Sequence, residues 1–489
     1  MAYQVNSTVP IRGLEKYFYA DGSWTIIVDV VHLTGNRSLI TTNASYTIQC
    51  LLKRYPPMRT RLRVNNNQHL LDILEYNSEY FSNDLFFSTV PIGNNTWENL
   101  VETRCNENPY CKNGTEIFPL FHFMLVYDDK QSDDQLFHLI LFSNHCVADG
   151  RSGIILINDF LTLVTSPNLF EISEPINNKI LPLIGELIPR PFGILYPLVS
   201  FIGKQIAKHN FHQLVRTRIP FKSIPLTNCQ SISCQTQLYK NKFLFASTST
   251  DVYEKLHQQC RSHELTINSS LFACLLLAVH RCFPIGKNTQ LKPFEISNAF
   301  DMRMRLPGSP LTTSSVGFFV GLHELKLKKS YSIRSTQFWS LAFESMSMTR
   351  NSLKRDGIPL TMHVFADLLK DDRNLRELGQ SESEGRVCEL GFSNLGKYPF
   401  SCDYQQGILK IRGLHFGNNC SGYRPGTNMY VACAGDGQLD FSMVHEIETD
   451  EKAKEFFDYY IRLVETCADQ TSCTNETTLE QLLTRADSR

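Results

Sequence analysis

The amino-acid sequence predicts an α/β protein with two similar lobes, and three observations support this interpretation. The chain has 489 residues, more than a single hydrophobic core usually organises. Runs with the character of strands and runs with helical periodicity occur in both halves, which is typical of mixed sheets covered by helices. Prolines crowd the middle of the chain. We therefore expect a first lobe at residues 1–165, a Pro-rich crossover linker at 166–225 and a second lobe at 226–489.

The first half contains strands and helices in succession. A β-branched run between two glycines predicts a strand at Trp24–Leu33. An amphipathic pattern that stops before two prolines predicts a helix at Thr42–Arg54. Two apolar runs, Phe118–Tyr127 and Gln135–Phe142, are separated by a charged turn and predict a hairpin. A helical pattern starts directly after Gly150, so that a strand, a loop and a helix meet there.

The second half begins after a stretch whose closely spaced prolines disfavour long regular elements. The strongest helical region follows, with one helix expected at Val252–His263 and another capped near Asn268. An amphipathic helix is expected at Asp450–Leu463. The strands expected in this half are Phe294–Phe300, Val387–Phe392, Leu409–Phe416, Met429–Ala434 and Leu439–Val444.

Composition and charge exclude several classes of protein. Lys and Arg total 48 against 49 for Asp and Glu, and this balance argues against a protein that mainly coats nucleic acid or anionic membrane, since both require a positive field. The fifteen cysteines lack the spacing of metal sites, and no phosphate-binding glycine loop is present. We therefore expect neither a bound metal nor a bound cofactor, and no nucleic-acid partner.

The N-terminus and one apolar segment bear on membranes. No basic stretch followed by an apolar run opens the chain, so we expect no secretory signal and a cytoplasmic, monomeric protein with reduced cysteines. The segment Ile180–Ile206 is apolar, but its longest uncharged run, Pro191–Gly203, has 13 residues, too few to span ~30 Å of hydrocarbon. This excludes a transmembrane segment and leaves peripheral contact with lipid open.

The residues most suggestive of chemistry are His145, Asp149 and Gly150, which form an H-x-x-x-D-G pattern at the end of an apolar strand. A neutral imidazole with a pKa near ~6.5 can remove a proton from a hydroxyl group at neutral pH. The bare pattern also fits a capping loop, in which Asp149 caps the helix and Gly150 supplies an unusual backbone angle. The neighbouring Cys146 could act as a nucleophile, but adjacent side chains at a strand end point to opposite sides. We therefore interpret Cys146 as a buried small residue.

The segment SNHCVADG resembles the H-H-x-x-x-D-G signature of the chloramphenicol-acetyltransferase-like superfamily, with Asn144 in place of the first histidine. This superfamily includes condensation domains of peptide synthetases, plant BAHD acyltransferases, fungal alcohol acetyltransferases and mycobacterial polyketide-associated acyltransferases. The D-F-G-W-G motif of the plant enzymes is absent, so the closest resemblance is to the alcohol acetyltransferase and polyketide-associated branch. Other segments that match in order and spacing are Gly13–Tyr17, Cys260–Ala278, Ile296–Pro310, Ser314–Gly321 and Phe392–Gly396.

The resemblance implies two chloramphenicol-acetyltransferase-like lobes with an active-site tunnel between them. It implies an acyltransferase that moves an acyl group from acyl-CoA, as cosubstrate, to a small-molecule alcohol, with His145 as the general base. Asp149 would face away from substrate and pair with an arginine of the other lobe, for which Arg303 is the best candidate. Ser393 or Asn394 would either donate a hydrogen bond to the oxyanion or hold a crossing loop.

Two other functions remain open from the sequence. One is a condensation-type enzyme that takes its acyl group from a carrier protein or uses an amine as acceptor. The other is a catalytically silent relative that binds an acyl ligand, although the intact set of His145, Asp149 and Gly150 argues against it.

Overall fold

The computed structural model is organised around two six-stranded sheets, one in each lobe. It describes residues 3–11, 15, 25–65, 68–79, 81–93, 95–107, 116–130, 135–169, 176–178, 181–213, 218–230, 237–286, 289–306, 308–354, 357–368, 386–419 and 424–489. Most of the expected Gly13–Tyr17 segment and Trp24 lie outside these residues, although Glu15 is described.

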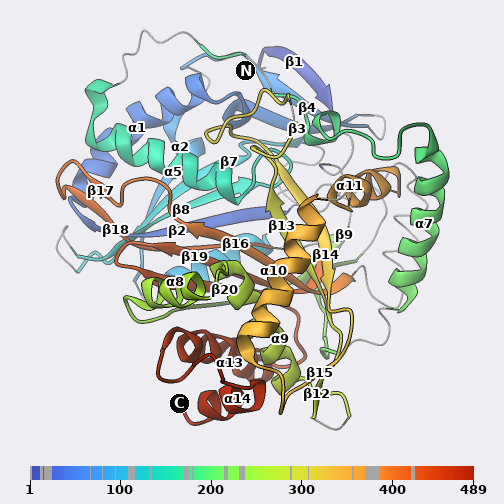
Figure 1. Ribbon diagram of the computed structural model, residues 1–489. Coiled ribbons are helices and arrows are strands. Elements are labelled where there is room, and N and C mark those ends of the chain that lie inside the picture. The colour runs from blue at the N-terminus through green and yellow to red at the C-terminus, as the bar shows by residue number, and fades with distance from the viewer. Residues whose placement is uncertain are drawn as a thin grey trace.

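The first sheet has the strand order β17-β18-β2-β8-β7-β5. The side chains of its central strands β2 and β8 are buried on both faces of the sheet. Helices cover one face, and the second lobe covers the other. Figure 1 shows α1 and α5 side by side over this sheet. The elements are β2 (Ile26–Gly35), β5 (Phe87–Pro91), β7 (Phe121–Tyr127), β8 (Phe137–Asn144), β17 (Asp403–Tyr404), β18 (Leu409–Asn418), α1 (Arg37–Arg54) and α5 (Gly150–Thr165).

The second sheet has the order β11-β20-β19-β16-β13-β14, and β13, β16 and β19 run parallel. Alternate residues of β19 point to opposite sides: Met429 and Val431 join the core beneath the helices, whereas Tyr430 and Ala432 face the first lobe. The strands are β11 (Lys242–Ser247), β13 (Glu295–Asp301), β14 (Val320–Lys326), β16 (Arg386–Lys397), β19 (Arg424–Ala434) and β20 (Gln438–His445). The covering helices are α8 (Val252–Ser262), α9 (Ile267–Cys282), α10 (Phe338–Lys354), α13 (Asp450–Ala468) and α14 (Leu479–Asp487).

The two lobes share strands across the chain. Strands β17 and β18 come from the expected second lobe, residues 226–489, but pair in the sheet of the first lobe, where β18 lies beside β2. A smaller sheet, β1-β4-β3-β6, completes the first lobe. It contains β1 (Val5–Pro10), β3 (Thr60–Asn65), β4 (Gln68–Leu74) and β6 (Glu116–Ile117). The α/β class with two lobes, each a mixed sheet covered by helices, is therefore confirmed.

Two local expectations were wrong. The proline-rich stretch contains an 18-residue helix, α7 (Tyr196–Gln213), because Pro197 occupies its first turn, where a missing backbone N–H costs nothing. The helix α9 is capped by Thr266, whose side chain accepts a hydrogen bond from the Ser269 amide, and not by Asn268.

No single helix in the described part of the chain is both long enough and apolar enough to cross a membrane. The helices α8 and α9 reach that composition only when taken together, and they are bent by 102° relative to each other.

Candidate active site

The His145 ring stands at the point where β8 ends and α5 begins. Its backbone N–H donates to the Thr25 carbonyl at 2.8 Å, and its Nδ1 contacts the Ala148 carbonyl oxygen at 2.9 Å. Because a carbonyl oxygen only accepts hydrogen bonds, Nδ1 must carry the proton. In the neutral ring, Nε2 therefore holds the lone pair that can accept a proton.

The protonation state of His145 follows from its surroundings. Burial lowers its pKa to about 4, against the smaller opposing effects of the Ala148 carbonyl and the Asp149 carboxylate. The Phe318 ring stands edge-on to the imidazole at 5.4 Å between centroids and adds apolar surface. The imidazole is therefore neutral at pH 7.

A cavity of about 220 Å³ connects His145 to residues of both lobes. Its walls come from the first sheet at Phe416, from β13 and β14, and from β16 and β19. Glu324 lies at one part of this wall, and burial raises its pKa to about 7. The other lining residues that bear on function are Arg151, Asp301, Arg303, Phe365, Ser393, Asn394, Asn418 and Tyr430.

Asp149 and Gly150 shape the turn that presents His145. Asp149 caps α5, since its Oδ1 accepts a hydrogen bond from the Ser152 amide at 2.8 Å. Gly150 does not have a left-handed backbone angle. A Cβ atom at Gly150 would lie 3.2 Å from the Leu395 side chain, so glycine serves here to let the second lobe approach closely. The interpretation that Gly150 supplies an unusual backbone angle is therefore wrong.

Arg303 of the second lobe pairs with Asp149. Its Nη2 lies 2.8 Å from Asp149 Oδ1 and its Nη1 lies 3.0 Å from Oδ2, a bidentate arrangement with both side chains fully buried. Burial alone would raise the pKa of Asp149, but the Arg303 guanidinium and the amide donors outweigh it and hold this pKa below its ordinary value. The pair is an ionic clamp between the two lobes.

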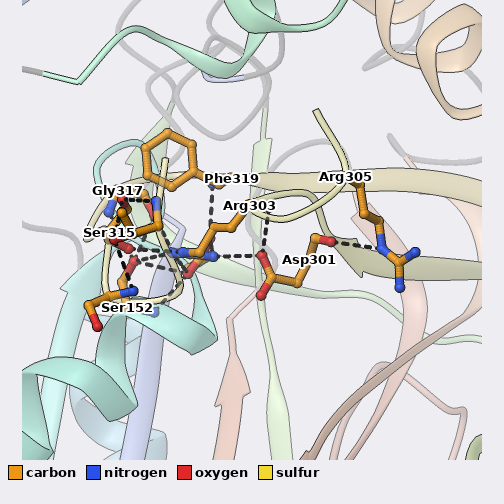
Figure 2. A network of polar contacts seen from close by, with 10 residues as sticks. Ser152, Asp301, Arg303, Arg305, Ser315, Gly317 and Phe319 are labelled. Carbon is orange, nitrogen blue, oxygen red and sulfur yellow. Dashed lines mark hydrogen bonds and ion pairs between the residues drawn. The ribbon is translucent and has the colours of Figure 1, made fainter. Parts of the chain in front are cut away.

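The remaining donors and acceptors of this clamp come from groups that the motif does not reveal. Arg303 Nε donates to the Ser315 carbonyl, and the Phe319 amide donates to Asp149 Oδ2 at 2.9 Å. Ser152 Oγ donates to the Gly317 carbonyl and lies 2.9 Å from Arg303 Nη2 (Figure 2). The buried charges are thus fully hydrogen-bonded, the condition under which a buried ion pair is tolerated.

Asp29 is a buried acidic residue close to the His145 loop that the sequence analysis did not identify. It lies in the middle of β2 and is completely buried, and neither carboxylate oxygen has a hydrogen-bond partner among the described residues. Burial, with a smaller effect from the charge of Asp149, raises its pKa well above the ordinary value. A Cβ atom at Gly153 of α5 would lie 1.9 Å from Asp29 Oδ2. The signal was present in the sequence as a lone acidic residue inside an apolar strand.

Ser393 and Asn394 both line the cavity, but the Asn394 side chain already takes part in two hydrogen bonds. The Asn394 amide donates to Asn268 Oδ1 at 3.1 Å and accepts from the Gly396 amide at 2.8 Å, so it ties the end of β16 to α9. The pairing of β16 with β19 is irregular between Asn394 and Gly396, so side chains do not alternate strictly between the two faces of the strand there.

Cys146 points away from the His145 cavity. It lines a second cavity of about 290 Å³ with Val147 and Phe318, on the other side of the loop. Its Sγ lies 3.7 Å from the carbonyl oxygen of Glu15, and burial raises the pKa of its thiol far above the ordinary range. A thiol held in the protonated form is a poor nucleophile.

The described residues contain no group of three or more His, Cys, Asp or Glu side chains arranged to hold a metal ion.

Two lobes with facing sheets have a histidine loop clamped between them. The model of the alcohol acetyltransferase family matches residues 106–466 of the chain. The chain therefore belongs to the alcohol acetyltransferase family, and this membership supports an acyltransferase activity. The sequence has no significant match among the curated proteins.

Solved structures share the whole fold at low sequence identity. TRI3 trichothecene 15-O-acetyltransferase from Fusarium sporotrichioides is 11% identical with a TM-score of 0.69, over 95% of this chain and 98% of that one. The epimerization domain from the third module of tyrocidine synthetase B is 15% identical with a TM-score of 0.57, over 99% of each chain. Polyketide synthase associated protein 5 from Mycobacterium tuberculosis is 15% identical with a TM-score of 0.56, over 95% and 100%. These likenesses establish the fold.

Proposed function

We propose that this protein transfers an acyl group from an acyl-CoA thioester to the hydroxyl group of an alcohol, with His145 as the general base. The observation that carries the proposal is the state of the His145 ring. Its Nδ1 proton is held by the Ala148 carbonyl, its Nε2 bears the lone pair, and the ring lines a cavity between the lobes. Membership of the alcohol acetyltransferase family supports the alcohol as acceptor.

The reaction needs no protein nucleophile, because a thioester is already activated. The alcohol oxygen attacks the thioester carbonyl while its proton passes to His145 Nε2. The Ser393 hydroxyl is the better placed of the two candidates to donate to the oxyanion, because the Asn394 amide already bonds to Asn268 and Gly396. When the tetrahedral intermediate collapses, the C–S bond breaks and the imidazolium returns its proton to the CoA thiolate.

Two cavities lie on either side of the His145 loop. The first, of about 220 Å³, contains the His145 ring and Ser393, and the second, of about 290 Å³, contains Cys146 and Phe318. Phe318 contacts the imidazole and lines the second cavity, so it stands between them. We propose that the acyl donor and the alcohol approach the imidazole from these two sides.

An alternative function is condensation with a carrier-protein donor or an amine acceptor. The fold is also similar to the condensation domain from the Monacolin K polyketide synthase MokA, and this likeness is the reason for considering the alternative. A catalytically silent acyl-binding relative is the third possibility, and the intact His145 ring with its fixed Nδ1 proton argues against it.

A substrate screen tests the proposal. Purified protein is incubated with acyl-CoAs of graded chain length and with matched sets of alcohols and amines, and products are identified by mass spectrometry alongside CoA release. We expect ester products and one equivalent of free CoA per ester, both lost in the His145→Ala variant. Amide products alone, or turnover only with acyl groups on a carrier protein, would establish the condensation alternative. Binding of acyl-CoA without turnover would establish the silent relative.

A further inference from the structure

The helix α7, together with the short turn that precedes it, exposes large apolar side chains to solvent. Ile194 is 96% exposed, an extreme value for an isoleucine in a folded chain. In Figure 1, α7 forms the outer edge of the molecule on the side of α11 (Gly357–Leu368). The other exposed apolar residues of this segment are Phe192, Leu195, Leu198, Phe201, Ile202 and Ile206. We call these seven residues the apolar face.

The opposite side of α7 is docked by specific contacts. The Tyr196 hydroxyl donates to Asp367 Oδ2 at 2.6 Å, and Ser200 Oγ donates to the same oxygen at 2.7 Å. One turn later, the lack of a side chain at Gly203 lets α11 approach at Val364. Positions 196, 200 and 203 share one side of a helix, and positions 195, 198, 202 and 206 share the other. The fold thus fixes the orientation of α7 and presents its apolar face outward.

The charge of the surrounding segment is one-sided. From residue 187 to residue 213, which spans α7 and the turn before it, the sequence contains no Asp or Glu, whereas Arg and Lys occur at positions 190, 204 and 208. The whole chain has a formal net charge of only −1, so its near-neutral average conceals this segment. Arg190 is exposed at the start of the segment, and Lys204 lies within α7 itself. Apolar residues on one helix face, accompanied by cations and no acids, are typical of helices that lie in the interface of an anionic bilayer.

The contacts of α7 also relate this surface to the cavity that contains His145. The helix α11, on which α7 docks, packs against β14. Phe365 of α11 and Leu322 of β14 both line the cavity. A lipid surface beneath α7 would therefore lie one helix away from the wall of the substrate cavity.

We infer that α7 docks this protein on the surface of an anionic lipid bilayer, with its apolar face inserted among the headgroups and acyl chains. The exposed apolar side chains of α7 can insert among the acyl chains of a bilayer. The cations of the same segment complement acidic headgroups. Docking of this kind is peripheral, so it requires no helix that crosses the membrane. The inference does not depend on the proposed reaction, because it concerns binding alone.

The test is co-sedimentation of the full-length protein with vesicles of phosphatidylcholine, or of equal parts phosphatidylcholine and phosphatidylserine. We expect binding to the mixed vesicles, weaker binding to phosphatidylcholine alone, and release by high salt or a carbonate wash. The variant Leu198→Gln/Ile202→Gln should bind at least about tenfold more weakly, because it removes two apolar side chains from the inserted face. Both residues are exposed, so the melting temperature should remain that of the wild type.

The matched control is Ile285→Gln/Phe343→Gln, which removes two comparably exposed apolar side chains, 53% and 57% exposed, outside α7. This control should bind vesicles like the wild type. The inference is overturned if the wild type binds neither vesicle, if it binds both equally, or if the two double variants weaken binding to the same extent. A second copy of the chain is the other occupant that the test can reveal. The inference is overturned if the wild type binds no vesicles but is a dimer, and if the α7 double variant is a monomer while the control variant remains a dimer.

Discussion

Two of the regions that contain buried histidines differ in what surrounds the imidazole rings. At one end of β8, His145 lines a cavity and its Nδ1 is held by a backbone carbonyl. Near the other end, His138 packs with His32 of β2 and His415 of β18, and the Nδ1 atoms of His138 and His32 lie 2.8 Å apart. We call these three residues the histidine cluster. The cavity that contains His145 is not lined by any of them.

The two regions share the property that is most often taken as a sign of catalysis. Burial lowers the pKa of His145 to about 4, and it lowers the pKa of His138 to about 4 and that of His415 to about 3. Trp97 of α3 (Trp97–Asn106) covers the cluster, stacking on His415 at 5.5 Å. A perturbed pKa therefore does not separate a functional histidine from a packed one. What separates His145 from the packed histidines is that its ring lines a cavity and that its Nδ1 proton is held by the Ala148 carbonyl.

The largest expected effect comes from exchanging the two kinds of histidine for alanine. His145→Ala should lower the rate of ester formation by at least the roughly 10²–10⁴-fold that a positioned base contributes, with little change in melting temperature. His138→Ala should do the reverse, because it leaves a hole among packed rings but touches no substrate. Steady-state kinetics and thermal denaturation of both variants measure this contrast. Retention of more than half the activity by folded His145→Ala would refute the proposed base.

The next effect concerns the ionic clamp beside His145. Arg303→Ala should reduce the free energy of unfolding by about 3–5 kcal/mol, because the Asp149 charge stays buried without its cationic partner. Asp149→Ala should fall at the lower end of this range, because Arg303 keeps its ion pair with the partly exposed Asp301 carboxylate at 3.0 Å. Both should also lower activity. The double variant should lose little more than either single variant, since the residues act together. Denaturant unfolding measures all three. Arg305→Ala is the control, because the Arg305 side chain is exposed and donates to the Asp301 backbone carbonyl (Figure 2). Fully additive losses would mean that the two residues act independently.

A smaller effect should appear when the histidine cluster is acidified. An unfolded imidazole binds a proton near pH ~6.5, whereas folded His138 resists protonation until about pH 4. The folded state therefore binds fewer protons in this window, so acid lowers the stability contributed by a neutral His138. The difference in free energy of unfolding between the wild type and His138→Ala should therefore narrow by on the order of 1–3 kcal/mol as the pH falls from ~6.5 to about 4.

Comparison of the two proteins is needed because Asp440 acts in the opposite direction. Burial raises its pKa to about 7, so its contribution to stability increases as pH falls toward ~3.8, the ordinary value for an aspartate. Urea denaturation at several pH values, with both proteins in the same buffers, removes this shared contribution. A gap that stays constant across the window would show that His138 titrates normally in the fold.

The smallest effect is expected for Cys146→Ala. The thiol faces the second cavity and is protonated, so transfer should continue at close to the wild-type rate. Loss of one buried sulfur atom should cost about 1 kcal/mol of stability. Intact-mass measurement after incubation with acyl-CoA should show no acyl group on Cys146. A stable adduct at this residue, together with loss of activity in the variant, would replace the direct mechanism with a covalent one.

The sequence predicted the parts of the site that are carried by side-chain identity. His145, Asp149 and Arg303 could be identified from their motifs, and Asp149 and Arg303 meet in the structure. The rest of the clamp uses backbone groups, such as the Gly317 carbonyl and the Phe319 amide, whose positions no residue type encodes. Their partners are set by how the two lobes approach each other.

The fold shows the same division between local and distant information. Periodicity predicted the strands β2, β7 and β8 and the helices α1, α5, α8 and α9, because the signals for these elements are local. They did not predict that β18 joins the sheet of the other lobe, because strand pairing is decided by packing across the whole molecule. The helix α7 was missed because its proline lies in the first turn, where the rule against prolines in helices does not apply.

The shared strand β18 has a consequence for how the chain is made. The ribosome releases β2 and β8 early, but β18 begins only at Leu409. Until then, one side of β2 presents unpaired backbone amides and carbonyls along a strongly apolar strand. A nascent chain in this condition is prone to pair with other chains, and chaperones protect such edges during synthesis. Completion of the first lobe, and with it the His145 loop, is thereby delayed until most of the chain has emerged.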